Sequence, residues 1–338
     1  MHKNPSHIME VGTGFWASKV LLTAVELDLF TQLGSSALAH RDLASWLGLA
    51  GRGAADFFDA LVALGFLQRE GDTDGVYRNT PETAAFLDKK SPQYMGGILE
   101  MLNARLYRFW GDLGEALRTG KPQNEIKQTG KPIFEAIYSD PIRTEQFLGA
   151  MAGVQMGSFM ALADKFDFSR HGTLCDVGGA SGALSIQVAR RHPKLRVTTF
   201  DLPVVERVAK QAVAAAGLSD RITVASGDFF ADPLPRADVI VMGNILHDWG
   251  VEAKRALIAK AFGALPPNGV LIAIENIIDS ERRKNVFGLL MSLNMLIETE
   301  DGFDYTAAQF DDWCRSAGFR STEVLPLAGP TSAGVAYK

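Results

Sequence analysis

His247 and Asp248 follow an apolar run in the stretch GNILHDWG, which spans residues 243–250. An imidazole has a reference pKa of about 6.5, so near neutral pH it can accept a proton from a reacting group. A second acid, Glu275, lies in the later apolar stretch GVLIAIEN. If the two stretches are neighbouring strands, Glu275 can accept a hydrogen bond from one ring nitrogen and leave the other for a proton. The pair predicts a general base, whereas Asp248 by itself is typical of a turn or a helix cap.

The glycine-rich stretch LCDVGGASGALS, residues 174–185, is a second candidate site. Its glycines stand at 178, 179 and 182, which fits neither the dinucleotide pattern G-x-G-x-x-G nor the P-loop pattern. Asp176 precedes them, and a carboxylate there suits a ligand with an ammonium group better than one with a pyrophosphate. S-adenosylmethionine has an ammonium, a carboxylate and a sulfonium but no phosphate, and glycines let the backbone approach it closely. We therefore predict S-adenosylmethionine as the cofactor.

Two further acids follow later strand-like runs. Asp201 ends LRVTTFD, and a carboxylate there can accept hydrogen bonds from both hydroxyls of a ribose. Asp228 follows RITVASG; it can accept a hydrogen bond from the amino group of an adenine, and the ring of Phe229 can cover that base. Each acid alone is an ordinary turn residue. Three acids after three successive strands, however, converge on one crevice of a parallel sheet.

These residues need a sheet to bring them together. From residue 172 onward, apolar strand-like runs alternate with helical segments, the strands being 173–177, 195–201, 221–228, 237–244 and 269–276, with 321–327 and 333–338 closing the chain. Continuously apolar strands that alternate with helices are typical of a parallel sheet covered on both faces. The predicted fold is α/β, a Rossmann-like doubly wound, mostly parallel sheet.

The residues before the sheet are predicted to be mostly helical. Helices at 41–49 and 51–67 precede two short strands around a Gly/Asp turn, which is the pattern of a winged helix-turn-helix. Residues 19–30 predict an amphipathic helix, and residues 105–117 and 142–166 predict further helices rich in Met and aromatic residues.

The composition restricts the partners. A net charge of −5 and 47 % hydrophobic residues indicate a globular protein without the basic patch that nucleic acid or an anionic membrane requires. Cys175 and Cys314 are far apart and make neither a metal-binding spacing nor a disulfide framework. No signal peptide is evident, and no apolar run approaches the roughly 18 residues of a membrane helix. We expect a cytoplasmic protein without metal, nucleic acid or membrane partner.

Six segments occur in the order DVGGASG, FDLP, SGDFF, ILHDW, ALPPNG and AIEN. With them the chain resembles the small-molecule O-methyltransferases of the plant caffeate and hydroxyindole type and their bacterial natural-product relatives. The likeness covers nearly the whole chain. It implies a class I S-adenosylmethionine methyltransferase fold and a homodimer formed through a winged-helix-like dimerisation domain at 1–100. It also implies a helical linker that contributes to the acceptor pocket at 101–168 and a cofactor-binding domain at 169–338.

The resemblance also implies roles for single residues. The cofactor-binding set comprises Asp176, Gly178, Gly179, Gly182, Asp201, Leu202, Asp228, Phe229 and Asn244. The catalytic set comprises His247 as the base with Glu275 and Asp304 as the acids that orient it. Phe147, Met151 and Met295 match positions that line the acceptor pocket.

Five positions depart from the family's pattern. The segment DGFDYT places Asp304 and Tyr305 where the family's pattern G-G-x-E-R-T has Glu and Arg. Gly243 and Asn244 replace a Lys and a Trp of the plant members, so cofactor contacts differ there. Val154 stands where the family has a His in the helix before the catalytic domain, which predicts a different acceptor.

The resulting expectation is transfer of a methyl group to a hydroxyl of a small, aromatic acceptor, with S-adenosylhomocysteine as the other product. Two alternatives keep the cofactor: methylation of a thiol, amine or carbon, where a thiolate depends little on a base, and a non-methylating reaction. A third, a DNA-binding regulator, conflicts with Asp56 and Asp59 on the predicted recognition helix.

Overall fold

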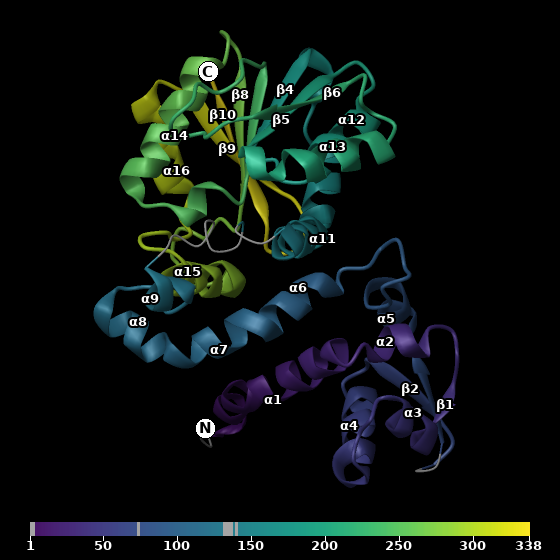
Figure 1. The fold of residues 1–338 in the computed structure, drawn as a ribbon. Helices are drawn as coiled ribbons and strands as arrows, with labels where there is room; N and C mark the ends of the chain where they lie inside the picture. The colour runs from purple at the N-terminus through teal and green to yellow at the C-terminus, as the bar shows by residue number, and fades with distance from the viewer. Residues whose placement is uncertain (1–3, 73–74, 131–137, 139–140) are drawn as a thin grey trace. The chain divides into compact units, whose positions relative to one another are not determined.

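The computed structural model describes residues 4–72, 75–130, 138 and 141–338 (Figure 1). The chain divides into two compact units, Met1–Arg108 and Phe109–Lys338. Each unit has its own hydrophobic core, and each is described separately below.

The first unit contains the predicted helix–helix–hairpin pattern. Its helices are α1 (Ser6–Glu26), α2 (Leu29–Leu33), α3 (His40–Trp46), α4 (Gly51–Ala63), α5 (Pro81–Phe86) and α6 (Gly96–Met101), followed by the π-helical turn η1 (Leu102–Leu106). Strands β1 (Leu38–Ala39), β2 (Leu67–Glu70) and β3 (Val76–Asn79) pair antiparallel in the order β1-β3-β2. Asp59 on α4 accepts hydrogen bonds from Tyr77 (2.7 Å) and Arg69, so this acid belongs to the unit's internal packing.

Helix α1 differs from the amphipathic helix predicted over 19–30. It ends at Glu26, because Asp28 adopts the left-handed conformation (φ 58°) that Asp tolerates better than most residues, and α2 begins at Leu29. Several apolar side chains of α1 are exposed: Ile8, Met9, Val11, Phe15 and Trp16. Contrary to the sequence analysis, α1 is long and apolar enough to cross a membrane, judged by length and composition only.

The second unit begins with helices. After α7 (Tyr107–Phe109), the 3₁₀ turn η2 (Trp110–Asp112) leads into α8 (Leu113–Thr119), so the single helix predicted over 105–117 is a series of short turns. Next come α9 (Glu125–Thr129) and α11 (Pro141–Lys165). The long helix predicted over 142–166 is confirmed by α11.

The central sheet confirms the predicted mostly parallel topology. Its strands are β4 (Thr173–Val177), β5 (Arg196–Asp201), β6 (Ile222–Ser226), β7 (Val239–Gly243), β8 (Val270–Glu275), β9 (Ser321–Pro326) and β10 (Ser332–Tyr337), in the order β6-β5-β4-β7-β8-β10-β9. Strands β4 to β8 run parallel, and β10 is antiparallel to both neighbours. The carboxyl ends of the five parallel strands therefore meet at one edge, which is where such sheets bind ligands.

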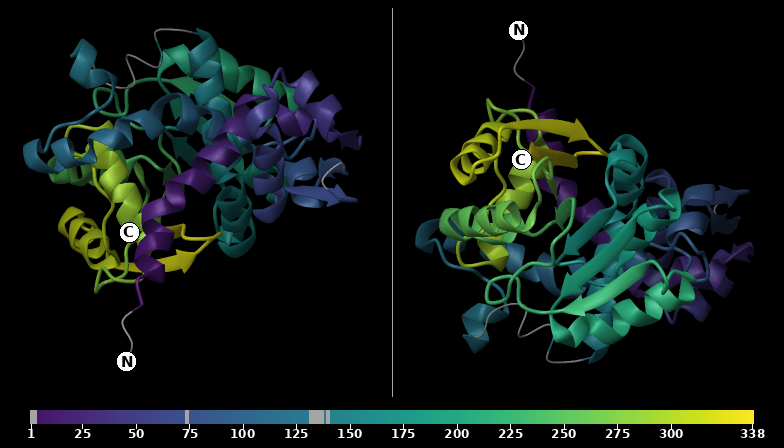
Figure 2. Two further views of the ribbon diagram at one scale, coloured as in Figure 1. Left: turned by 90° about the horizontal axis from the view of Figure 1, so that it is seen from below. Right: turned by 90° about the horizontal axis from the view of Figure 1, so that it is seen from above.

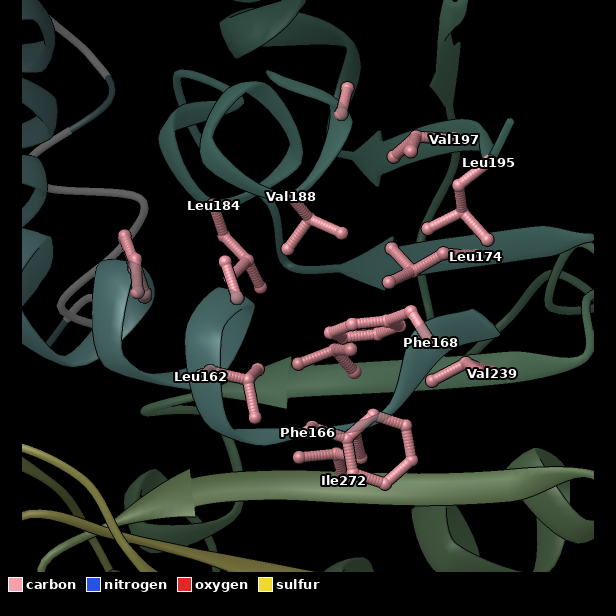
Figure 3. Close-up of a cluster of buried hydrophobic side chains, with 14 of the residues drawn as sticks. Leu162, Phe166, Phe168, Leu174, Leu184, Val188, Leu195, Val197, Val239 and Ile272 are labelled. Atoms are coloured by element: carbon pink, nitrogen blue, oxygen red, sulfur yellow. The ribbon is translucent and has the colours of Figure 1, made fainter. Parts of the chain in front are cut away.

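Helices cover both faces of this sheet (Figures 1 and 2). One face carries α12 (Ala183–Arg191) and α13 (Glu206–Ala215), and the other carries α14 (Val251–Ala264) and α16 (Ala307–Ala317); α15 (Val286–Glu298) precedes α16. Successive residues of a strand enter opposite cores, so Val239 lies in one and Ile240 in the other. Figure 3 shows the first core, where Leu162, Leu184 and Leu174 meet from α11, α12 and β4.

Candidate active site

The loop after β4 needs its glycines for two different reasons. Gly178 (φ 69°) and Gly182 (φ 76°) adopt the left-handed conformation, and Gly182 is the N-cap of α12. At Gly179 the reason is space, because a Cβ would lie 2.1 Å from Oγ1 of Thr199. The loop therefore lies directly against β5.

Asp201 fixes the outer part of this loop. Its Oδ2 accepts a hydrogen bond from the backbone N–H of Ala180 (2.8 Å), and its Oδ1 accepts one from the N–H of Leu202 (2.7 Å). Burial raises the pKa of Asp201, although these two donors favour its ionised form. A carboxylate held in this way keeps its remaining lone pairs for a ligand.

Asp176 is the buried acid of the loop, with 2 % of its surface exposed. Its Oδ2 accepts a hydrogen bond from the hydroxyl of Ser185 (2.8 Å). Burial raises the pKa of Asp176 to about 7, and the nearby charge of Asp201 adds to the effect, whereas Ser185 opposes it. The carboxyl is thus poised to ionise when a cation comes close.

Two pockets lie along the loop and share Ala180. The first is lined by Met151, Ala152, Gln155, Phe159, Asp176, Gly178, Gly179, Ala180, Ser181, Ala183, Leu184 and Gly243. The second is lined by Ala180, Thr199, Asp201, Leu202, Val205, Glu206, Ala209, Val224, Ala225 and Ser226. No Lys or Arg is among these lining residues, so neither pocket offers a side-chain cation to a phosphate.

Three predicted cofactor residues lie outside these two linings. Oδ1 of Asp228 accepts a hydrogen bond from the N–H of Phe230 (2.8 Å), which tightens the turn after β6. The carbonyl of Phe229 accepts one from Lys260 (2.6 Å). Asn244, just after β7, has a positive φ of 51° and donates its N–H to the carbonyl of Ile274.

His247 lies in the 3₁₀ turn η5 (Leu246–Asp248) that follows β7, and 5 % of its surface is exposed. Its Nδ1 lies 3.7 Å from Oε2 of Glu275 and 3.7 Å from Oδ1 of Asp304. Glu275, at the end of β8, also accepts the backbone N–H of His247 (3.3 Å). The adjacency of β7 and β8 thus brings the predicted base and acids together.

The segment after α15 brings Asp304 to the ring, and it does so through a close backbone packing. A Cβ at Gly302 would lie 2.6 Å from the carbonyl oxygen of His247 and 2.4 Å from Oγ1 of Thr299. The N–H of Gly302 donates to that hydroxyl (2.9 Å). Asp304 is held in turn by its N–H, which donates to Ser292 (3.2 Å).

Of the two roles predicted for Asp248, a turn or a helix cap, the structure shows the turn and not the cap. Helix α14 begins after Gly250 without a side-chain cap, and Oδ1 of Asp248 lies instead 3.5 Å from Nε2 of His247. The cap is absent because the turn folds back toward the ring. Both ring nitrogens therefore have a carboxylate nearby.

Burial and charge oppose each other in this cluster. Burial by itself lowers the pKa of His247, but Glu275, Asp248 and Asp304 outweigh it and raise the pKa to about 10. Burial raises the pKa of Glu275 to about 7 and that of Asp248 to about 6, against the attraction of the imidazolium. The cluster as a whole binds protons tightly near neutral pH.

Comparison with known proteins identifies the family of the chain. Residues 110–320 match the O-methyltransferase domain, and residues 9–89 match the O-methyltransferase dimerisation domain. The chain belongs to the O-methyltransferase family. The resemblance in the ordered segments is thereby confirmed.

Individual relatives of this O-methyltransferase cover nearly its whole length. The tetracenomycin polyketide synthesis 8-O-methyl transferase TcmO of Streptomyces glaucescens is 40 % identical and covers 99 % of the chain and 97 % of its own. The N,N-dimethyltransferase OxyT of Streptomyces rimosus is 32 % identical over 93 % of the chain and 90 % of its own. Human N-acetylserotonin methyltransferase, solved in complex with S-adenosylmethionine, superposes with a TM-score of 0.91 at 30 % identity, covering 100 % of the chain and 98 % of its own.

The residues predicted to line the acceptor pocket are placed differently from one another. Met151 on α11 lines the first pocket. Phe147, also on α11, is partly buried with its ring 6.3 Å from that of Tyr138. Met295 on α15 is buried, and Val154 is 44 % exposed. Neither Phe147 nor Met295 is part of the two pocket linings.

Sequence reasoning missed two polar residues of this enzyme. Gln155 lines the first pocket, and its Oε1 is buried without a hydrogen-bond partner among the described residues. Lys254 on α14 is fully buried, and Glu275, Asp304 and Asp248 act on its charge. Gln155 could have been found, because it lies four residues after Met151 and so on the same face of one helix. No local sequence pattern marks Lys254.

The residues present fit S-adenosylmethionine. Asp176 and the unpartnered Oε1 of Gln155 both line the first pocket, and together they suit an ammonium group. His247, Glu275 and Asp304 each place one polar atom within 4.8 Å of the others, a spacing that a small cation could also use. The two carboxylates that face one ring nitrogen also suit an imidazole that carries a second proton.

Proposed function

We propose that this O-methyltransferase moves the methyl group of S-adenosylmethionine to a hydroxyl of a small, aromatic acceptor, with His247 as the general base. One observation carries the assignment of the base: a buried imidazole at the carboxyl edge of the sheet has Glu275 and Asp304 at Nδ1. Such acids orient a ring and stabilise its charged form after it has taken a proton.

The cofactor supplies the methyl group on a positively charged sulfur, which is a good leaving group. Asp176 and Gln155 would hold its ammonium, and Asp201 its ribose. Asp228, Phe229, Leu202 and Asn244 would surround its adenosine, next to the backbone of Gly178, Gly179 and Gly182. The protein thus contributes position and exclusion of water rather than a metal.

The acceptor's proton is the part of the reaction that needs His247. A phenol has a pKa of roughly 10 and is mostly protonated at neutral pH. Nε2 of His247 is the ring nitrogen that would receive this proton, beside Asp248. When S-adenosylmethionine is bound, its sulfonium would add a positive charge to the site, and this charge would lower the pKa of the ring because like charges disfavour the charged form. The imidazole then becomes available as a base.

The acceptor class rests on the relatives. TcmO is named for the 8-O-methylation step of a polyketide synthesis, which supports an aromatic hydroxyl. An amine acceptor is the second candidate, because OxyT is named as an N,N-dimethyltransferase. We assign acceptor contacts to Phe147, Met151 and Met295 and to the helical segment 101–168.

Assembly and location are part of the proposal. The dimerisation-domain match and the exposed apolar residues of α1 support a homodimer formed through residues 1–100, with residues 169–338 as the cofactor-binding domain. Both cysteines are unpaired and buried, which suits the cytoplasm.

The test is a screen of polyketide-type phenols, amines and thiols with isotopically labelled S-adenosylmethionine. We expect equal amounts of S-adenosylhomocysteine and an O-methylated product, identified by mass and fragmentation. Methylation of amines alone would replace the hydroxyl assignment with the second candidate. Turnover of the cofactor without any methylated product would contradict the proposal.

A further inference from the structure

Lys254 is a cation buried next to the catalytic cluster. It lies on α14 with 0 % of its surface exposed. Its ammonium lies 3.6 Å from the centroid of the Phe303 ring and within about 6 Å of the rings of Tyr305 (5.8 Å) and Trp313 (6.0 Å), and it donates a hydrogen bond to the carbonyl of Trp249. A fully buried lysine is costly unless its charge is compensated, so its position needs a reason.

The compensation comes from the acids that surround His247. Burial lowers the pKa of Lys254 to about 8, while Glu275, Asp304, Asp248 and Asp301 each act to raise it. These acids reach the lysine from three elements: β8, the turn η5, and the segment between α15 and α16. The lysine therefore keeps its charge at neutral pH. Glu275, Asp248 and Asp304 act on its ammonium and on the imidazole of His247.

The acids around His247 outnumber its single positive charge, and the ammonium of Lys254 reduces the excess. An imidazolium at His247 balances one of the three carboxylates Glu275, Asp304 and Asp248 and leaves two negative charges in a buried place. One ammonium reduces this excess by one. It also lowers the proton affinity of every group around it, because a positive charge disfavours protonation.

Position 305 supplies an independent observation. Tyr305 stands where the family's pattern has an Arg. It is buried, and its hydroxyl has no hydrogen-bond partner among the described residues. Its ring lies 5.8 Å from the ammonium of Lys254. A side chain at position 305 therefore lies close to the ammonium of Lys254.

We propose that Lys254 is a positioning residue of the reaction: its ammonium, held by Phe303 and the carbonyl of Trp249, favours the ionised form of Glu275 and Asp248 beside His247. It does not contact the reacting atoms. The inference rests on the proposed role of His247 as the base.

The test is the dependence of kcat on pH in the full-length enzyme, with Lys254→Met as the main variant. If His247 is the base, we expect the rate to rise with pH as its ring loses the proton. Removing a positive charge raises the pKa of every neighbouring group, so Lys254→Met should shift this rise to higher pH by about one unit. Lys254→Arg, which keeps the charge, should leave the position of the rise unchanged.

Rescue separates a charge effect from a packing effect. Tyr305→Arg introduced into Lys254→Met should move the rise back toward the wild-type pH. Lys338→Met is the matched control, because the ammonium of Lys338 also lies over a ring (Phe262, 4.2 Å) and donates to backbone carbonyls. This control should not shift the pH profile.

The outcomes distinguish this inference from the proposed function. If His247 variants stay active, the assignment of the base fails, and the inference fails with it. If His247 is required but Lys254→Met keeps the wild-type pH profile, only the inference is overturned. If Lys254→Met and Lys254→Gln both fail to fold while Lys254→Arg folds, the charge serves folding alone, which also overturns the inference.

Discussion

At the scale of single residues, Asp176 shows how a binding site can cost stability. Its carboxyl is buried beside the glycine loop with one hydrogen bond, from Ser185. The pKa of about 7 in the folded protein exceeds the value of about 3.9 in an unfolded chain. Between these values the folded state binds more protons than the unfolded state, so the free energy of unfolding falls as the pH rises.

Replacement of Asp176 by Asn should remove this penalty. We expect Asp176→Asn to be more stable than wild type at pH 8, by at most about 4 kcal/mol, and to lose the advantage at pH 4. Because the charge for the ammonium is gone, its affinity for S-adenosylmethionine should fall at least about tenfold. Urea unfolding at both pH values and calorimetric titration check the two effects. Asp312→Asn, at an exposed acid paired with Arg255, should show neither effect.

At the scale of elements, the cluster of His247, Glu275 and Asp304 depends on how closely the segment 299–306 packs against the turn η5. The segment 299–306 runs past η5, and Gly302 is the point of contact with the carbonyl of His247. A methyl group there requires a backbone shift. Since Asp304 is two residues away, that shift changes its distance from the ring.

Gly302→Ala should therefore affect the chemical step more than cofactor binding. We expect kcat to fall about tenfold or more, with the dissociation constant of S-adenosylmethionine within about twofold of wild type. Gly263→Ala is the control, because a Cβ there meets nothing within 4 Å on helix α14. It should raise stability by about 0.5–1 kcal/mol without a change in kcat. Equal losses of kcat in both variants would contradict this account.

The elements also show what the sequence could predict. Strands β4 to β8 were predictable because each is a short run rich in apolar and β-branched residues between helical segments, and the acids that end or follow them come with the strands. The position of Asp248 was not predictable, because the local sequence does not show that the turn η5 brings this acid close to Nε2 of His247. Lys254 was not predictable either: its ring contacts and two of its four acids come from residues 301–313, about 50 positions away.

At the scale of the whole molecule, helix α1 exposes apolar side chains that a partner could cover. Phe15 and Trp16 are 55 % and 62 % exposed in the isolated chain, and patches of this kind mark interaction surfaces. The same helix is long and apolar enough to cross a membrane, judged by length and composition only. The dimerisation-domain match over 9–89 favours a second copy of the chain as the partner.

Charged substitutions on α1 test this partner. We expect wild type to sediment as a dimer of 36.6 kDa chains, and Phe15→Asp with Trp16→Asp to sediment as a monomer, because a buried unpaired charge is costly. Val324→Asp, at an exposed apolar residue of β9, should remain a dimer. Wild type that sediments as a monomer, or dissociation of the control alone, would count against the interface on α1.

The most direct test of the central claim is the turnover of His247→Gln with its preferred phenol. We expect kcat to fall by about 10²–10⁴-fold, while the affinity for S-adenosylmethionine stays close to that of wild type. The matched control is His192→Gln, which should keep wild-type turnover. The ring of His192 contacts the carbonyl of Ala163 and has no part in the proposed reaction. Near-normal turnover of His247→Gln would contradict the assignment of the base.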